Sequence, residues 1–373
     1  AAKGEMDSAL STQQNRVLPV YQELGLKREE AVAWGKIADI QFVRGRLDAA
    51  MRIRMRYEIP AFQQAGDVYT EAVAWLKVGD IQHRRGNPGE ALRVYTDKAL
   101  PVFARLKDAH GIAVTWSRIG DVYHTQGRLD EELRLRQDVQ LPALRKLGDL
   151  RGVAVTLGKI GAILYLRGRW EDALKMHRGE QLRIFRQIGD RQAEATSWGQ
   201  IAKIMTAKGN LNEALGIRLD KEIPVYRRAG NVRAEAIAWA HIAAIRKRQG
   251  RFDEALDLCR SKVLPVHQQT GDKRQEAITW GLIASILESQ RNIERAIVTL
   301  KSKALPLLEE IGDLRELSIS RIRLARLLLR RDEPGDLERA RGTLQAARRT
   351  VCDMRLPECE DAEGLLQGLE SKR

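Results

Sequence analysis

Apolar residues recur along the chain at spacings of three and four, which is the periodicity of an amphipathic α-helix. The segment Glu71–Gly86 shows this pattern, with Ala72, Trp75, Val78 and Ile81 at helical spacing. The glycine that closes the segment suits a left-handed C-terminal cap. No segment alternates apolar and polar residues over the length of a strand, so we predict helices and no β-strand.

The helical pattern repeats with a strict period of 41 residues. One frame holds the glycines Gly45, Gly86, Gly127, Gly168, Gly209 and Gly250. A second frame, with Leu157 in its gap, holds Trp34, Trp75, Trp116, Trp198, Trp239 and Trp280. A third, with Arg183 in its gap, holds Pro19, Pro60, Pro101, Pro142, Pro224, Pro265 and Pro306. Equal spacing without drift excludes an inserted domain from about residue 4 to about residue 330.

Each repeat is predicted to hold two helices. Helix A carries the tryptophan frame and ends at the glycine frame. Helix B follows, because strings such as GRLDEELR and GNLNEAL place a short polar residue before acidic residues and the Ala or Leu of a first helical turn. We interpret these polar residues as helix N-caps. They are Asp48, Asp130, Asn212 and Asp253.

The proline frame falls inside helix B. Pro60 lies twelve residues after Asp48 and six before Gly66, where the helix is predicted to end. Proline has no N–H group, and its ring displaces the carbonyl four residues earlier. We therefore predict a kink in every helix B that contains the proline, and its repetition would set the curvature of the stack.

The repeat resembles the tetratricopeptide repeat (TPR). The string WSRIGDVY at Trp116–Tyr123 has the spacing of the TPR helix A signature, and Ala91 with Tyr95 has that of helix B. The resemblance implies an all-α solenoid, a right-handed superhelix of antiparallel helix pairs. The period exceeds the usual 34 residues or so by about two helical turns. Longer repeats of this sort are similar to those of kinesin light chains, Pins-like adaptors and the sensor arms of bacterial signalling proteins.

The pattern divides the chain into three segments. Residues 1–26 correspond to helix B of a truncated first repeat, because a shift of one period places Gly4 on Gly45. Residues 27–331 hold the tandem helix pairs, and residues 332–373 hold a degenerate last helix B and a capping helix. A helix B without its helix A predicts that the chain is the C-terminal fragment of a longer protein with an upstream effector domain.

If the resemblance holds, helix A lines the concave face where a ligand would bind. The inward positions lie one, five and eight residues after each tryptophan. The first row is mostly small, which would leave room for a ligand chain: Gly35, Leu76, Ser117, Gly158, Gly199, Ala240 and Gly281. From the other two rows we take the candidate groove residues Asp39, Phe42, Asp80, His83, Asp121, His124, Tyr165, Lys203 and Lys247.

These two rows change from acidic and aromatic at the start of the array to cationic around Lys203 and Lys247. Two interpretations of the acidic end stay open. The aspartates could form the local pairs Lys36–Asp39, Lys77–Asp80 and Arg118–Asp121, each worth about 0.2–0.5 kcal/mol. Alternatively, they contact a protein or peptide segment that carries basic and apolar groups, since they focus negative charge locally.

The overall charge brings in a second class of partner. The chain has 64 Lys and Arg against 50 Asp and Glu, a formal net charge of +14. A basic stripe consists of Arg246, Lys247, Arg248, Arg251, Arg321, Arg323, Arg326, Arg330 and Arg331. Phosphates could bind such a stripe, although Gly, Asp and His at the groove positions do not suit base readout. We therefore predict a non-catalytic protein- or peptide-binding scaffold or sensor array, with nucleic-acid binding as the alternative.

Catalytic and metal-binding motifs are not found in the sequence. It has no GxxxxGK[ST], GxSxG or HExxH string, so we expect no enzyme activity and no cofactor. His83 and His124 share a frame, but no spacing supplies a third ligand. We therefore expect two groove-lining side chains there and no metal.

Three cysteines, Cys259, Cys352 and Cys359, are too few for a disulfide framework. We expect reduced thiols, with a disulfide across the turn at Pro357 as the alternative. No apolar stretch has the length of a membrane span, and the first residues lack the apolar core of a signal peptide. These observations predict a cytoplasmic protein that does not bind membranes.

Overall fold

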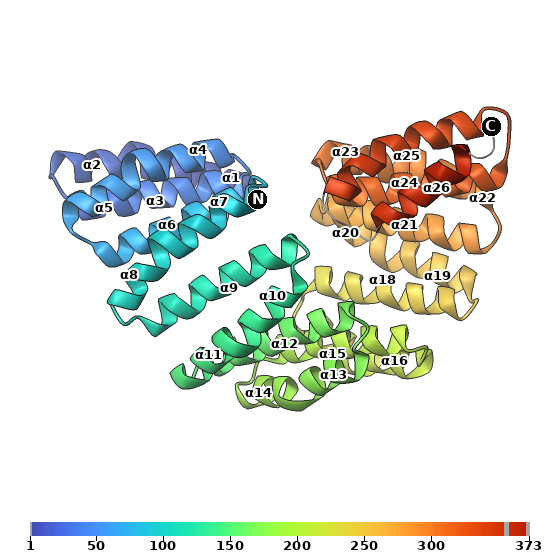
Figure 1. Cartoon of the computed structure of the whole chain (residues 1–373), viewed down its shortest axis with the longest axis horizontal. Coiled ribbons are helices and arrows are strands. Elements are labelled where there is room, and N and C mark those ends of the chain that lie inside the picture. Colours follow the sequence, from blue (N-terminus) through green and yellow to red (C-terminus); the bar gives the residue numbers. More distant parts are fainter. Residues whose placement is uncertain (1, 354–357, 371–373) are drawn as a thin grey trace. The chain divides into compact units, whose positions relative to one another are not determined.

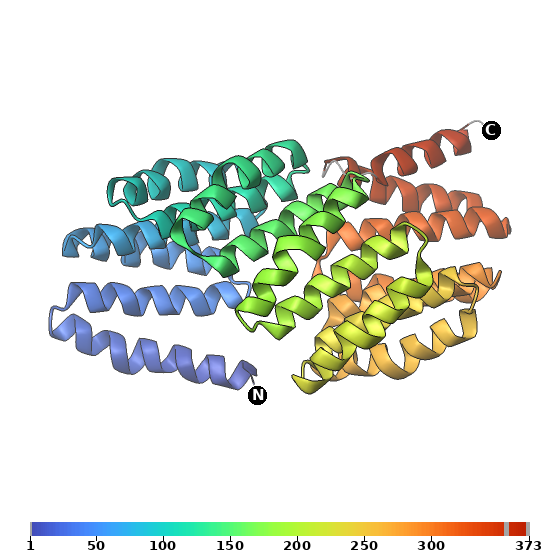
Figure 2. The ribbon, with the colours of Figure 1, turned by 90° about the horizontal axis from the view of Figure 1, so that it is seen from below.

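The computed structural model describes residues 2–353 and 358–370, and every regular element in these residues is helical. The chain forms two compact units, and the boundary between Thr156 and Leu157 falls inside one helix. We call the residues up to Thr156 unit 1 and those from Leu157 onward unit 2. Within each unit, helices that follow one another in the chain lie side by side (Figures 1 and 2).

Helix A of each repeat is one continuous α-helix. These helices are α3 (Lys27–Val43), α6 (Val68–Arg84), α9 (Ala109–Thr125), α12 (Leu150–Leu166), α15 (Arg191–Ala207), α18 (Val232–Arg248), α21 (Lys273–Ser289) and α24 (Leu314–Arg331). Each is followed by a glycine of the predicted frame, or by Arg291 or Asp332, in the left-handed conformation that ends the helix.

Helix B is an α-helix interrupted by a π-helical segment, here labelled η. In unit 1 these composite helices are α1 (Ala2–Thr12), η1 (Gln13–Val17), α2 (Leu18–Glu23); α4 (Leu47–Ile53), η2 (Arg54–Glu58), α5 (Ile59–Ala65); α7 (Pro88–Arg93), η3 (Val94–Ala99), α8 (Leu100–Arg105); and α10 (Leu129–Arg134), η4 (Leu135–Gln140), α11 (Leu141–Leu147).

In unit 2 the composite helices are α13 (Trp170–Met176), η5 (His177–Gln181), α14 (Leu182–Gln187); α16 (Leu211–Ile217), η6 (Arg218–Glu222), α17 (Ile223–Arg228); α19 (Phe252–Leu258), η7 (Cys259–Val263), α20 (Leu264–Thr270); and α22 (Ile293–Thr299), η8 (Leu300–Ala304), α23 (Leu305–Ile311). The uninterrupted α25 (Asp336–Asp353) and α26 (Glu358–Glu370) follow α24.

The π-helical segments replace the simple kink that the prolines predict. Ile59, just before Pro60, donates its N–H to the carbonyl of Arg54, five residues back, and so continues the helix in a wider turn. The segment η5 is π-helical too, although Arg183 stands in the proline frame and Gly179 departs from helical dihedrals. Proline is therefore not required for the π conformation, which instead provides a place where proline fits.

The N-caps lie at a different position from the one predicted. Asp67 caps helix A, since its carboxylate accepts the N–H of Thr70 at 3.0 Å. Equivalent caps are Asp108, Asp149, Asp190, Asn231, Asp272 and Asp313. By contrast, helix B begins one residue before Asp48 and has no side-chain cap. The same holds for Asp130, Asn212 and Asp253, whose helices also begin one residue earlier.

The N-terminal helix also departs from the frame. Gly4 was expected in a turn, as at Gly45, but α1 begins at Ala2 and Gly4 lies within it. Gly45 has φ 75° and does end a helix. The 41-residue period therefore predicts the first helix B correctly, but it wrongly predicts a turn at Gly4.

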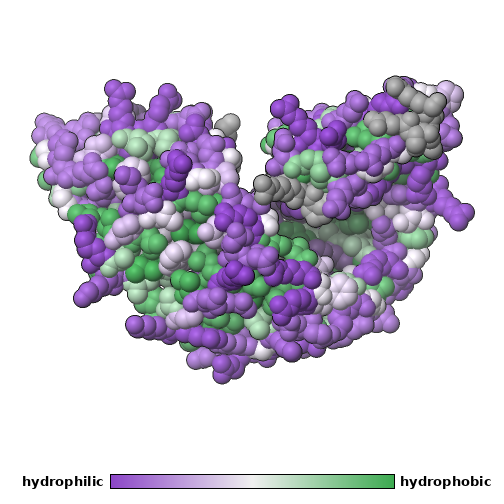
Figure 3. Space-filling model, viewed as in Figure 1, coloured by the Kyte–Doolittle hydropathy of each residue, from purple (hydrophilic) through white to green (hydrophobic). Residues whose placement is uncertain are grey.

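The core is built from small and aliphatic side chains where helices A and B meet. A further frame consists of alanines 41 residues apart, and all of them are buried: Ala31, Ala72, Ala113, Ala154, Ala195, Ala236 and Ala277. The six tryptophans of the frame are half-buried, and the indole of Trp75 donates to Glu71 at 3.1 Å. On the faces that Figure 3 shows, polar side chains predominate and apolar ones lie among them. None of the described helices is long and apolar enough to cross a bilayer.

Cys352 and Cys359 form a disulfide, which corrects the expectation of reduced thiols. It joins α25 to α26, and Cys259 remains a free, buried thiol. Burial raises the pKa of the Cys259 thiol to about 12, so this group stays protonated at neutral pH. The turn at Pro357 lies outside the described residues. Disulfides are typical of oxidising compartments, so this one does not support a cytoplasmic location, which stays a prediction.

Candidate ligand-binding surface on helix A

In unit 1 the predicted acidic row is paired with cations of the following repeat. Asp39 on α3 accepts a hydrogen bond from Lys77 on α6 at 2.6 Å, and Asp80 on α6 forms an ion pair with Arg118 on α9 at 2.8 Å. The sequence predicted Lys77–Asp80 and Arg118–Asp121 as local pairs. The structure instead joins neighbouring helices A, 38 residues apart in the chain. We call this arrangement the acid–base ladder.

Helix B supplies a partner to each of the three acids. Arg54 pairs with Asp39, and Arg136 donates to Asp121 at 2.7 Å. The Tyr95 hydroxyl fills the same role, since it donates to Asp80 at 2.7 Å. These helix B groups come from one frame, six residues before the proline frame. Asp39, Asp80 and Asp121 therefore have partners within unit 1, and the free negative charge invoked for a basic ligand is largely neutralised.

The helix B arginines are absent from the candidates predicted from the sequence. Arg54 and Arg136 are at most 1% exposed, and each contacts further buried polar groups. Arg54 donates to Glu58 at 2.5 Å, while Arg136 donates to Glu132 and Gln140. Burial raises the pKa of Glu58, and Arg54 offsets only part of this effect. The position six residues before each proline of the frame recurs every 41 residues. Inspection of that position in the sequence could have identified these arginines.

The small residues of the first row make room for the protein itself. A Cβ on Gly35 would lie 2.4 Å from Oε1 of Glu58, and one on Gly199 would lie 2.4 Å from Oε1 of Glu222. Gly158 is crowded in the same way by Gln181. The space predicted for a ligand chain is therefore filled in these repeats by helix B side chains.

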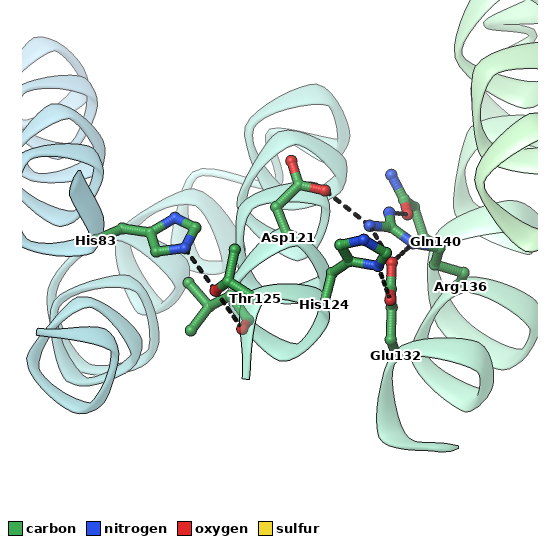
Figure 4. A network of polar contacts seen from close by, with 8 residues as sticks. His83, Asp121, His124, Thr125, Glu132, Arg136 and Gln140 are labelled. Atoms are coloured by element: carbon green, nitrogen blue, oxygen red, sulfur yellow. Dashed lines mark hydrogen bonds and ion pairs between the residues drawn. The ribbon is translucent and has the colours of Figure 1, made fainter. Parts of the chain in front are cut away.

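His83 and His124 are drawn into separate contacts (Figure 4). His83 of α6 lies 2.8 Å from the hydroxyl of Thr125 on α9. The Nδ1 of His124 lies 2.8 Å from the buried carboxylate of Glu132, whose hydrogen bond raises the pKa of His124. Desolvation lowers the pKa of His83. In the described part of the chain, no cluster of three metal-ligating side chains includes either histidine.

The other candidate of unit 1 is aromatic. Phe42 on α3 lies under the guanidinium of Arg84 on α6, whose carbon is 4.6 Å from the ring centroid. Arg84 also donates to the Phe42 carbonyl at 3.4 Å. Phe42 is half-buried, so part of its ring remains accessible.

Unit 2 places Tyr165 and Lys203 in contact but has no acid–base ladder at this point. The ammonium of Lys203 lies 4.5 Å from the centroid of the Tyr165 ring. Lys247 donates to the hydroxyl of Ser285 and has no carboxylate partner among the described residues. Desolvation lowers the pKa of both lysines, and the charges of Arg218 and Arg323 add to this effect at Lys203 and Lys247, respectively.

The basic stripe lies in unit 2 and is mostly paired with carboxylates. The ion pairs are Arg246–Glu254, Arg251–Glu254, Arg321–Glu309, Arg326–Asp361, Arg330–Glu288 and Arg331–Asp336. Lys247, Arg248 and Arg323 have neutral oxygen partners instead. The stripe therefore offers far less free positive charge than the sequence suggests.

An open cavity of about 500 Å³ lies elsewhere in unit 2. Leu215, Leu219, Leu258, Trp239 and Ile242 are among its lining residues, and acidic side chains contribute to its wall. None of the nine candidate groove residues lines this cavity. It is thus separate from the helix A rows.

Comparisons with known proteins agree with the helical architecture. No protein-family model matches the chain, and no curated protein matches its sequence. Solved structures do. The apo form of the quorum sensor NprR from B. thuringiensis has a TM-score of 0.61 and 15% identity over 78% of this chain and 80% of that one. A STAND (Signal Transduction ATPase with Numerous Domains) protein with a tetratricopeptide repeat sensor from Pyrococcus horikoshii has a TM-score of 0.58 and 16% identity.

The chain has the TPR fold. The match covers 86% of this chain but only half of the STAND protein. A Rap protein complexed with competence and sporulation factor is also similar, with a TM-score of 0.51 and 14% identity over 87% of this chain and 97% of that one. The all-α TPR-like fold predicted from the repeat frames is confirmed. At identities this low the likeness concerns the fold alone.

Proposed function

We propose that this TPR protein is a non-catalytic scaffold or sensor that binds a peptide or protein segment along its helix A surfaces. The observation that carries the proposal is a contrast between positions. Packing positions hardly change from repeat to repeat, whereas the row of Asp39, Asp80, Lys203 and Ser285 changes charge and size. A surface that serves only to pack would not need this variation, while one that reads a ligand would.

Two of the similar structures support a sensing and binding role. NprR is described as a quorum sensor, and the Rap protein was solved as a complex with competence and sporulation factor. The candidate contacts in unit 1 are Phe42, His83 and His124, which are not fully buried. That the ligand carries basic and apolar groups stays a prediction. The charge argument for it is weakened, because the aspartates of the acid–base ladder already have cationic partners.

Nucleic-acid binding gains no support. Salt-dependent phosphate binding depends on cations that are free to replace counterions. Most arginines of the basic stripe are already paired with carboxylates within unit 2.

To test the proposal, peptides that bind the whole chain are selected from a random peptide library. A selected peptide should bind the protein, and His83→Ala should weaken binding by severalfold if the peptide lies on unit 1. His110→Ala is the matched control, because His110 is an exposed side chain at the start of α9, away from the row. Selection that yields no binding peptide, or peptides insensitive to every helix A substitution, would contradict the proposal.

A further inference from the structure

One repeat of unit 2 has the partners of the acid–base ladder without its acid. In the frame of Asp39 and Asp121 stands Lys203. In the frame of Arg54 and Arg136 stands Arg218, on η6, which is 2% exposed. The position 38 residues after Lys203, which Lys77 and Arg118 occupy in unit 1, is held by His241 on α18. Three basic side chains thus occupy a site that unit 1 builds around a carboxylate.

The hydrogen bonds of Arg218 differ from those of Arg54 where the carboxylate is missing. Its Nη1 donates to Glu222 at 2.6 Å, as Arg54 does to Glu58. Its Nη2, however, donates to the carbonyl of Gly199 at 3.2 Å, whereas Nη2 of Arg54 reaches Asp39. The Nε atoms of both arginines are buried without a hydrogen-bond partner, so the difference lies in the partner of Nη2. At Nη2, a hydrogen bond to a neutral carbonyl oxygen therefore takes the place of the ion pair with a carboxylate.

Lys203 and His241 are both exposed, so a ligand can reach them. Lys203 contacts the ring of Tyr165 but forms no ion pair with any described residue. His241 forms no hydrogen bond or ion pair in the described part of the chain. Although the His241 residue is partly open to solvent, the protein around its ring lowers its pKa to about 3 by desolvation, and the charges of Arg218 and Lys203 add to this effect. The nearby carboxylate of Glu222 is already engaged by Arg218.

We propose that an acidic side chain of a bound peptide supplies the missing carboxylate, received by Lys203 and His241 with Arg218 behind them. This site refines the proposed function by naming the chemistry of one ligand position in unit 2. A carboxylate fits better than a nucleic acid, because the same frames hold an Asp carboxylate in unit 1 and because neighbouring arginines are paired. A bound carboxylate would favour the charged form of His241 and so raise its pKa.

Hexaglutamate with blocked ends is the probe, with hexaglutamine as its neutral analogue and a six-nucleotide oligothymidylate as the phosphate-bearing one. We expect hexaglutamate to bind the whole chain, hexaglutamine not to bind, and the oligonucleotide to bind more weakly. Lys203→Gln should weaken hexaglutamate about tenfold, the scale of one charged hydrogen bond. Lys221→Gln, which removes an exposed lysine of η6 outside these frames, should leave binding unchanged.

The histidine side chains give a second readout, followed by NMR pH titration of the six histidines. Saturating hexaglutamate should raise the pKa of His241 by more than one unit and leave the other histidines unchanged, with His241→Gln assigning the signal. The proposed site would be overturned if hexaglutamate did not bind, or if Lys203→Gln and Lys221→Gln weakened binding equally. It would also be overturned if hexaglutamate left the pKa of His241 unchanged, or if the oligonucleotide bound more tightly than hexaglutamate. Library peptides that bind helix A surfaces without an acidic residue would overturn it too, yet leave the proposed function standing.

Discussion

The repeat of Asp39 and the repeat of Lys203 share one backbone design and differ in how they handle charge. In the first, Arg54 and Lys77 converge on a carboxylate, so the surface is balanced. In the second, Arg218 and His241 are near a lysine, and the cluster keeps an excess of positive charge. The same helical scaffold can therefore carry a structural ion pair in one repeat and an open ligand position in another.

The largest expected effect comes from breaking the buried part of the acid–base ladder. Arg54→Leu would leave Glu58, itself 5% exposed, without its partner. We expect a loss of about 3–5 kcal/mol in the free energy of unfolding, measured by chemical denaturation. In one repeat of unit 2 the same two positions hold Leu300 and Ala304, both fully buried. The double variant Arg54→Leu with Glu58→Ala should therefore regain most of the loss, and a double variant as unstable as the single one would contradict this account.

Installing the ladder in unit 2 should have the next largest effect. Lys203→Asp would place a carboxylate near Arg218 and His241, as in the repeat of Asp39. We expect a gain of about 0.5–1 kcal/mol, because the new charge is exposed, together with a higher pKa of His241 and loss of hexaglutamate binding. Thermal unfolding and NMR titration measure the two effects. A pKa of His241 that stays near 3 in this variant would show that the two repeats are not equivalent.

Removing one acid from the ladder in unit 1 should cost somewhat less. Asp39 is about half exposed, so Asp39→Asn should lower the free energy of unfolding by about 0.5 kcal/mol, and by less in high salt. The matched control is Asp138→Asn on the exposed face of η4. Chemical denaturation at low and high salt distinguishes the two, and a cost of Asp39→Asn that does not change with salt would argue against the ion pair.

The smallest effect concerns pH in unit 1. The hydrogen bond to Glu132 raises the pKa of His124 above that of an unfolded histidine. Its stabilisation is therefore fully present below about pH 6.5 and is lost as the pH rises through the folded pKa. We expect only a few tenths of a kcal/mol, since His124 is half exposed. Comparing unfolding at pH 6 and pH 8 in His124→Gln and in the control His110→Gln measures it, and the pH slope should change only in the first.

The fold could be predicted from the sequence because its signals recur at fixed intervals. The tryptophan and glycine frames report local packing and helix ends, which the structure confirms at positions such as Gly86. The partners of Asp39 could not be read in the same way. Lys77 lies 38 residues away and Arg54 lies on another helix, so a rule for neighbours on one helix selects the wrong partner. The disulfide was only the alternative to reduced thiols, because seven residues of spacing do not fix the distance between Cys352 and Cys359.

The π-helical segments affect how the repeat tolerates changes in length. Each contains a turn that is one residue wider than an α-helical turn, and side chains after it are offset by about 100° from an α-helical path. Deleting one residue from Arg54–Glu58 would restore the α-helical register and swing Ile59 and Phe62, both buried, away from the core. An insertion or deletion of one residue inside helix B should therefore disrupt the packing of buried side chains in that repeat. Duplication of whole 41-residue modules preserves the offset, which explains how an array can grow without disturbing its interior.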